Sequence, residues 1–159
     1  RLALSACRLN VWKILAKCRH MRYNSRGMAI FLSRSPEDTL AWAENYAKTL
    51  KAGDVVLLDG EMGAGKTVLA QGIARGLGVK EDVLSPTYAY VNSYAPMFHF
   101  DCYRIESVRQ AEELGFSDYF DAGRICLVEW SENIAPLLPE HCKKITIRKK
   151  GEGEREIIA

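Results

Sequence analysis

Residues 60–67 read Gly-Glu-Met-Gly-Ala-Gly-Lys-Thr and match the pattern G-x-x-x-x-G-K-[ST] at every fixed position. An apolar, partly β-branched run at 55–58 precedes this octapeptide and is typical of a buried strand. A helical pattern over 68–77 follows it, and Gly78 supplies a helix stop. Strand, glycine-rich turn and helix in this order predict a phosphate-binding loop. The alternative is a glycine-rich turn that ends in Lys-Thr by chance, and such a turn would not need a strand before it and a helix after it.

The residue types of this loop suit a nucleoside triphosphate with its magnesium ion. Glycines let the backbone come close to phosphate, successive N–H groups point inward, and the positive end of the helix faces the anion. Lys66 adds a positive charge for the β and γ phosphates, and the Thr67 hydroxyl is placed to ligate Mg²⁺. The expected cofactors are ATP and Mg²⁺, with Met62, Gly63, Ala64, Gly65, Lys66 and Thr67 as binding residues.

Two acidic residues are candidates for the carboxylate that a magnesium nucleotide site needs beyond its loop. Glu129 follows four apolar residues, and Asp101 follows the run 97–100. Asp59 also ends an apolar run, but it precedes the loop on the same strand, so we expect a structural role for it. Each acid alone could be a solvated strand terminus. Both together in a chain with this loop favour roles at the metal or at water, and with Lys66 they are the expected catalytic residues.

Three further residues have an open interpretation from sequence alone. Thr87 follows Pro86 and could sense the γ phosphate as a switch residue, or could be a turn threonine. His99 is more typical of a packed strand histidine than of a base. Trp130 could stack on a nucleotide base or on a partner, or could belong to the core.

The rest of the chain extends this unit into alternating strands and helices. Ser35 is placed as a helix N-cap with Pro36 at the first helical position. The alternation predicts an α/β protein, namely a three-layer α/β/α P-loop NTPase domain with a mixed, mostly parallel sheet. We predict strands at 29–32, 55–58, 88–91, 97–101, 125–128, 144–148 and 155–158, a turn at 92–96, and helices from Pro36 up to Gly53, at 68–77 and at 108–114.

Composition narrows the class of protein. A chain of 159 residues with 48% apolar residues can form one domain with a substantial core. It contains no apolar stretch near the roughly 20 residues that a membrane span needs. Its five cysteines form no C-x-x-C pair and its three histidines are scattered, so a zinc site is not expected. Such dispersed cysteines suit reduced thiols in an intracellular protein.

Charge divides the chain into two parts. Residues 1–36 carry eight Lys or Arg and no acid, whereas the remainder carries 14 bases against 20 acids, a net charge of −6. A large electrostatic footprint for nucleic acid is therefore not evident in the remainder. We predict a basic extension at 1–27 outside the core and a P-loop ATPase domain at 28–159. The alternatives for 1–27 are a transit peptide and a basic arm that contacts nucleic acid or a partner.

Several strings together resemble the TsaE (YjeE) family of small bacterial P-loop ATPases. The loop pattern alone is generic, but the other strings and their separations are specific. The resemblance covers about 28–159 and leaves 1–27 without a counterpart. The strings are Gly60-Glu-Met-Gly-Ala-Gly-Lys-Thr67, Ser85-Pro-Thr-Tyr88, His99-Phe-Asp-Cys-Tyr-Arg104, Glu113-Leu-Gly115 and Leu127-Val-Glu-Trp130.

The resemblance implies a role for each candidate residue. By position, Lys66 and Thr67 bind phosphate and metal, and Glu129 is similar to the second residue of the magnesium site. Asp101 resembles the acid needed for hydrolysis, Thr87 a switch-like loop residue, and Trp130 a tryptophan close to the nucleotide. Cys102 stands where leucine is common in the family, and its side chain should alternate away from that of Asp101.

The resemblance also implies a function in forming N6-threonylcarbamoyladenosine in tRNA. In that family the protein binds ATP and works on a complex of two partners, TsaB and TsaD, of which TsaD carries the transferase site. We therefore expect contact with tRNA only through such a complex, no membrane association and a cytoplasmic location. An organellar location would follow only if 1–27 is a transit peptide.

Two other functions compete with an ATPase of tRNA modification. A small-molecule or nucleotide kinase also uses a P-loop in a chain of this size, but needs an acceptor pocket and usually arginines on a mobile lid. Arg104, Arg109 and Arg124 are scattered in the sequence, and no lid-like insertion is visible. The third possibility is a scaffold for which ATP binding, rather than turnover, matters.

Overall fold

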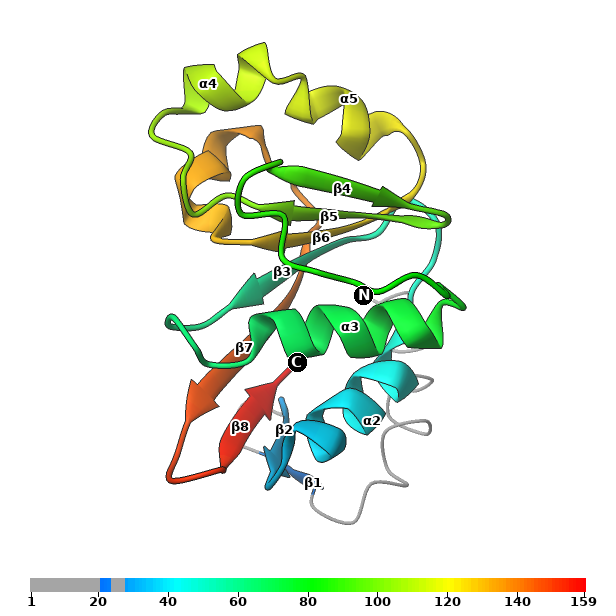
Figure 1. The fold of residues 1–159 in the computed structure, drawn as a ribbon, viewed down its shortest axis with the longest axis vertical. Coiled ribbons are helices and arrows are strands. Elements are labelled where there is room, and N and C mark those ends of the chain that lie inside the picture. The colour runs from blue at the N-terminus through cyan, green and yellow to red at the C-terminus, as the bar shows by residue number, and fades with distance from the viewer. Residues whose placement is uncertain (1–20, 24–27) are drawn as a thin grey trace, which may run out of the picture.

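The computed structural model describes residues 21–23 and 28–159, and the rest of the predicted extension 1–27 lies outside these residues. The described chain forms one eight-stranded sheet in the order β1-β2-β8-β7-β3-β6-β5-β4 (Figure 1). The strands are β1 (Met21–Tyr23), β2 (Ala29–Ser33), β3 (Val55–Asp59), β4 (Val91–Tyr94), β5 (Met97–Asp101), β6 (Ile125–Glu129), β7 (Lys143–Lys149) and β8 (Arg155–Ile158), and the helices are α2 (Pro36–Ala47), α3 (Lys66–Gly76), α4 (Val108–Glu113), α5 (Phe116–Asp121) and the 3₁₀ helix η1 (Ser131–Leu137).

The sheet is mixed, as predicted, but it is less parallel than we expected. The central strands β7, β3, β6 and β5 pair in parallel, whereas the other four of the seven neighbouring pairs are antiparallel. Tight hairpins produce two of the antiparallel pairs, β4–β5 and β7–β8, because a strand that returns through a short turn must run antiparallel. β2 then joins the outer edge of β8, and β1 joins β2.

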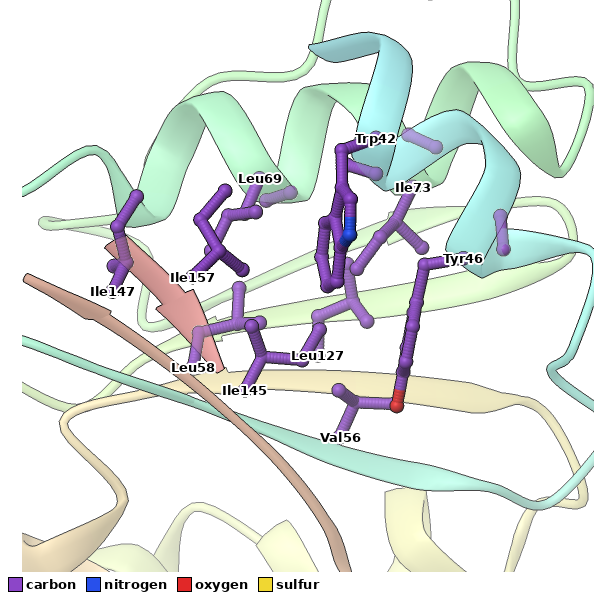
Figure 2. Close-up of a cluster of buried hydrophobic side chains, with 14 of the residues drawn as sticks. Trp42, Tyr46, Val56, Leu58, Leu69, Ile73, Leu127, Ile145, Ile147 and Ile157 are labelled. Carbon is purple, nitrogen blue, oxygen red and sulfur yellow. The ribbon is translucent and has the colours of Figure 1, made fainter. Parts of the chain in front are cut away.

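Helices cover both faces of the sheet and give the predicted three layers. One buried cluster joins α2 and α3 to strand residues such as Val56 and Leu58, as Figure 2 shows. A second cluster joins α4, α5 and η1 to Val55 on the opposite face. Neighbouring residues of β3 thus serve opposite cores, which is the alternation expected of a strand buried on both sides.

The start of α2 follows the predicted capping chemistry. The Ser35 hydroxyl accepts a hydrogen bond from the Asp38 N–H at 3.1 Å, and Pro36 occupies the first helical turn. Trp42 and Tyr46 project from this helix into the core and stack with ring centroids 5.3 Å apart. The helix ends at Ala47, before the predicted stop at Gly53.

Helices α2 and α3 pack closely at two glycines. A Cβ added at Gly72 would lie 2.5 Å from the Ala43 Cβ and 2.7 Å from the Leu40 carbonyl oxygen. A Cβ added at Gly76 would lie 2.5 Å from the Glu44 carbonyl oxygen. Both distances to backbone oxygen are shorter than any tolerable contact, so α3 can approach α2 this closely only with glycine at these positions.

Gly72→Ala is therefore expected to destabilise the fold although alanine is the better helix former. Overpacking of this kind costs about 1–3 kcal/mol, which exceeds the helix-propensity gain of about 1 kcal/mol. Thermal unfolding followed by circular dichroism should show a lower melting temperature. Gly151→Ala is the matched control, because its added Cβ would meet only the Glu154 carboxylate at 3.8 Å. Equal melting temperatures for the two variants would contradict the close packing.

The structure corrects the predicted strand at 88–91 and the turn at 92–96. The strand is Val91–Tyr94, and the chain turns at Ala95 and Pro96. Residues before it form a separate turn, because the Tyr90 N–H donates to the Pro86 carbonyl at 2.7 Å and Tyr90 adopts a left-handed φ of 62°. Helices α5 and η1 were not predicted, since each is short and lacks a clear period.

The N-terminal boundary predicted at Met28 does not coincide with the edge of the described sheet. Met21–Tyr23 pairs antiparallel with Ala29–Phe31 of β2, so at least three residues of the predicted extension join the sheet. The division into 1–27 and 28–159 otherwise stays a prediction. In the described part of the chain, no helix combines the length and apolarity that crossing a bilayer requires. The three cysteines described there, Cys102, Cys126 and Cys142, are free thiols.

Candidate functional site: a P-loop pocket at the ends of the central strands

The predicted phosphate-binding loop connects β3 to α3 at the carboxyl end of the central strands. Gly63 and Gly65 adopt left-handed φ values of 70° and 113°, a region that side chains disfavour. Gly60 is required for a different reason. A Cβ there would lie 2.4 Å from the Ile147 carbonyl oxygen of β7. The glycines of the motif thus let the loop fold tightly against the neighbouring strand.

Lys66 lies in the pocket with only 6% of its surface exposed. Its Nζ donates to the Gly60 carbonyl at 2.5 Å and to the Glu61 carbonyl at 3.1 Å, and it lies 4.0 Å from the centroid of the Trp130 ring. Burial lowers the pKa of Lys66 from its ordinary value, and nearby carboxylates, first among them Glu129, oppose this shift. The ammonium group is therefore held close to the site by weak acceptors and a ring face.

Glu129, at the end of β6, reaches the start of α3. Its Oε1 lies 3.5 Å from the Thr67 hydroxyl and 2.9 Å from His99 Nε2. The Glu129 side chain is 4% exposed and that of His99 is fully buried. The predicted metal pair Thr67 and Glu129 is thus brought together across 62 residues of sequence.

Asp101, at the end of β5, holds the loop that carries Thr87. Its Oδ2 accepts hydrogen bonds from Ser85 Oγ at 2.6 Å and Thr87 Oγ1 at 3.0 Å. Its Oδ1 accepts from the Tyr103 N–H at 3.0 Å. Asp101 pairs with Glu129 in the parallel β5–β6 ladder, so the two acids lie side by side. Asp59 forms an exposed ion pair with Lys144 at 3.0 Å, and the structural role expected for it stays a prediction.

One pocket of about 340 Å³ collects these groups. Of the predicted binding residues, only Ala64 does not line it, because its side chain is buried and its carbonyl accepts from Arg155 Nε at 2.9 Å. Ser85 and Tyr103 line the pocket and were not predicted. Both could have been found from the family strings, because Ser85 begins the string that contains Thr87 and Tyr103 belongs to the string 99–104. The lining residues are Met62, Gly63, Gly65, Lys66, Thr67, Ser85, Thr87, Asp101, Tyr103, Glu129 and Trp130.

Trp130 forms a wall of the pocket rather than part of a sealed core. It adopts a left-handed φ of 57°, which is uncommon for a bulky residue, and begins η1. Its ring contacts the Tyr103 ring with centroids 4.9 Å apart. Its indole lies against Lys66 and also packs partly against the second hydrophobic cluster, so its role in nucleotide binding stays a prediction.

The donor set suits magnesium bound together with phosphate. A hydroxyl and a carboxylate oxygen, from Thr67 and Glu129, are hard oxygen ligands. Within residues 21–23 and 28–159, no cluster of three or more His, Cys, Asp or Glu is arranged to hold a metal ion. Mg²⁺ commonly needs no such cage, since substrate phosphates and water supply its other ligands. The residues present therefore fit a magnesium ion that arrives with a nucleotide.

The three arginines considered for a kinase lid each contact other side chains. Arg104 lies over the Tyr88 ring at 4.4 Å, and Arg109 pairs with Glu113 at 2.9 Å on the surface of α4. Arg124 lies over Phe98 at 4.0 Å, on the side of the β4–β5 hairpin. Among the residues that the structure describes, the pocket lining includes no arginine.

Comparison with known proteins agrees with this arrangement. The family model described as "Threonylcarbamoyl adenosine biosynthesis protein TsaE" matches residues 33–157. A tRNA threonylcarbamoyladenosine biosynthesis protein TsaE of Bacillus subtilis (strain 168) is 42% identical over 127 residues, which cover 77% of this chain and 79% of that protein. The protein of the same name from Treponema pallidum (strain Nichols) is 36% identical over 129 residues, which cover 79% of this chain and 96% of that protein.

A solved structure shares the fold. The crystal structure of Bacillus subtilis YdiB superimposes with a TM-score of 0.70 at 33% sequence identity and covers 88% of this chain and 86% of its own. The family match extends over the P-loop and both acid-bearing strands, and it includes every residue that lines the pocket. On this match and on the identity to its relatives over most of their length, the chain belongs to the TsaE family.

Proposed function

We propose that this protein is the ATP-binding and hydrolysing subunit required for N6-threonylcarbamoyladenosine modification of tRNA, and that it acts on a TsaB–TsaD transferase complex. The observation that carries the proposal is the convergence of Lys66, Thr67, Glu129 and Asp101 on one pocket. The family's name supplies the biosynthetic context, and the pocket supplies the chemistry of a P-loop ATPase.

ATP binding uses the loop and Lys66. The backbone N–H groups around Gly63 and Gly65, with the start of α3, face the phosphates. Lys66 exchanges the Gly60 and Glu61 carbonyls for phosphate oxygens, which are stronger partners for an ammonium group. Thr67 and Glu129 are the residues that would hold Mg²⁺, whose charge stabilises the negative phosphates when it is bound.

Asp101 is the acid that would position or activate water for hydrolysis. Both of its oxygens already accept hydrogen bonds, and two of the donors are the hydroxyls of Ser85 and Thr87. Oδ1 accepts one hydrogen bond and can accept another from water, whereas water reaches Oδ2 in place of a hydroxyl. We therefore assign Thr87 to a loop that changes partner when the γ phosphate enters the pocket, which is the behaviour of a switch segment.

A partner protein completes the site in this proposal. The described lining of the pocket supplies one lysine and no arginine, so we infer that a partner chain adds positive charge for the transition state. The net charge of −6 over residues 37–159 does not favour direct binding of tRNA by the domain. In this proposal the protein reaches tRNA through the TsaB–TsaD complex in the cytoplasm, or in an organelle only if residues 1–27 are a transit peptide.

Two conservative substitutions should separate the roles of the acids. Glu129→Gln is expected to raise the Mg²⁺ concentration needed for tight ATP binding, because an amide is a weaker magnesium ligand than a carboxylate. Asp101→Asn should leave Mg²⁺-dependent binding close to that of the wild type and slow hydrolysis about 100-fold or more. Calorimetric ATP titrations at several Mg²⁺ concentrations, with phosphate release, check both expectations. The same shift in magnesium dependence for both variants would contradict this division of roles.

Phosphate release with and without purified TsaB–TsaD complex tests the function as a whole. An ATPase of tRNA modification responds to the complex and not to tRNA alone. A kinase would transfer labelled phosphate to a small acceptor without the complex. A scaffold would bind ATP and support modification without multiple turnovers, which single-turnover measurements detect.

A further inference from the structure

His99 lies directly behind the proposed magnesium site, and the mechanism above gives it no role. It is on β5, two residues before Asp101, and it pairs with Leu127 of β6. Met97, Asp101 and His99 share one face of β5 because strand side chains alternate. Met97 belongs to the cluster beneath α3, so His99 also faces α3 and the P-loop.

The His99 ring is fully buried and makes one hydrogen bond, from Nε2 to Glu129 Oε1 at 2.9 Å. A carboxylate oxygen accepts, so the ring proton of this bond is on Nε2. Nδ1 is buried and has no hydrogen-bond partner among the described residues. A packed strand histidine would be expected to satisfy both nitrogens. One ring nitrogen is therefore buried without a hydrogen bond. The single polar contact of the ring is to Glu129, the predicted metal ligand.

The hydrogen bond from His99 restricts the orientation of the Glu129 carboxylate group, which is the group that would bind a metal. His99 and Thr67 lie on either side of the same oxygen, Oε1, at 2.9 and 3.5 Å. In the described part of the chain, no hydrogen bond falls on Oε2. Anchoring one oxygen stops rotation of the carboxylate and leaves the other oxygen for a metal or its bound water.

We propose that His99 is a positioning residue that fixes the Glu129 carboxylate for magnesium binding. This inference rests on the proposed function, since it concerns the same site. Groups that hydrogen-bond a metal ligand orient it and raise its effective affinity, and their loss typically costs about 10- to 100-fold in metal affinity. His99 acts here through Glu129 and contacts neither nucleotide nor metal.

The test compares three substitutions by ATP titration over a series of Mg²⁺ concentrations and in EDTA. His99→Phe removes the donor and is expected to raise the Mg²⁺ concentration for half-maximal binding about 10- to 100-fold. Its ATP affinity in EDTA should equal that of the wild type. His99→Gln places an amide N–H near the position of Nε2 and should recover most of the magnesium affinity. His99→Asn is one carbon shorter and should not.

Two controls separate positioning from a merely structural role. Met97→Leu changes a buried neighbour on the same face of β5 at nearly constant volume, and it should bind magnesium and ATP as the wild type does. In a Glu129→Gln background, His99→Phe should produce no additional shift in magnesium dependence, because the group it positions has lost its charge. If circular dichroism shows that His99→Phe does not fold, the magnesium affinities of His99→Gln and His99→Asn are compared instead. A higher affinity for His99→Gln then supports the positioning role.

The outcomes distinguish this inference from the proposed function. Magnesium dependence equal to that of the wild type in the Phe and Asn variants, or no recovery by Gln, overturns the role of His99 and leaves the proposed function intact. A further shift in the Glu129→Gln background also overturns it. ATP binding by the wild type that ignores Mg²⁺ overturns the proposed metal site and this inference with it.

Discussion

Replacing Lys66 by alanine is expected to lower the affinity for ATP about a hundredfold or more while the fold persists. Hydrogen bonds to charged groups contribute about 1.5–3 kcal/mol each, and the ammonium group can serve both the β and γ phosphates. Each 1.4 kcal/mol corresponds to a factor of about ten in affinity. Lys66 is buried but belongs to neither hydrophobic cluster, so its loss should not unfold the domain. Isothermal titration calorimetry measures the affinity, and circular dichroism checks the fold.

Lys149→Ala is the matched control for this experiment. Lys149 also contacts the P-loop, through a bond from Nζ to the Met62 carbonyl at 3.0 Å, but it lies outside the pocket and is exposed. Removing it deletes the same charge near the same loop and should change ATP affinity little, because exposed charges are screened by water and salt. Comparable losses in the two variants would mean that general electrostatics, rather than a direct phosphate contact, binds the nucleotide.

The second large effect is expected from the partner complex. The isolated protein should hydrolyse ATP slowly, and addition of TsaB–TsaD should raise steady-state phosphate release about a hundredfold or more at saturating ATP. A positive side chain supplied by a partner is worth several powers of ten in phosphoryl transfer. Lys66 is the one basic residue of the described pocket lining, so a positive side chain from a partner would add to its charge.

Two controls for the partner effect change one component at a time, either this chain or the added tRNA. Lys66→Ala should abolish both the basal and the stimulated rate, and tRNA without the complex should change neither. Fast turnover by the isolated wild type with no response to TsaB–TsaD would indicate an independent ATPase. A response to tRNA alone would contradict the proposal that the complex mediates contact with tRNA.

The parts of the site that could be predicted are those with a local cause. The P-loop is set by glycines whose φ values other residues disfavour and, at Gly60, by a contact too close for a Cβ, so its pattern is visible within eight residues. Ser35 caps α2 for an equally local reason. Both acids were found because a charged residue that ends a buried apolar run is unusual. These signals need no knowledge of the rest of the fold.

The parts that were missed depend on contacts between distant segments. The β4 strand begins at Val91 because Tyr90 turns back to Pro86, and the Tyr90 carbonyl accepts from the Asp101 N–H at 3.0 Å, neither of which composition reveals. His99 was interpreted as a packing residue because its partner, Glu129, lies 30 residues away. The sheet is less parallel than predicted because periodicity identifies strands but not their neighbours.

The hydrogen bonds of Asp101 join a segment of the pocket that can move quickly to strands that move slowly. Asp101 and Glu129 sit on adjacent strands of the parallel ladder, so displacing either one requires local unfolding of the sheet centre. Ser85 and Thr87 belong to a connecting segment, and they leave Asp101 when two side-chain hydrogen bonds break. Loop motions of this size occur in nanoseconds to microseconds, whereas opening of a core ladder approaches the timescale of global unfolding. We therefore expect residues 84–88 to transmit a conformational change on nucleotide binding to another protein, while the two acids keep their positions in the sheet.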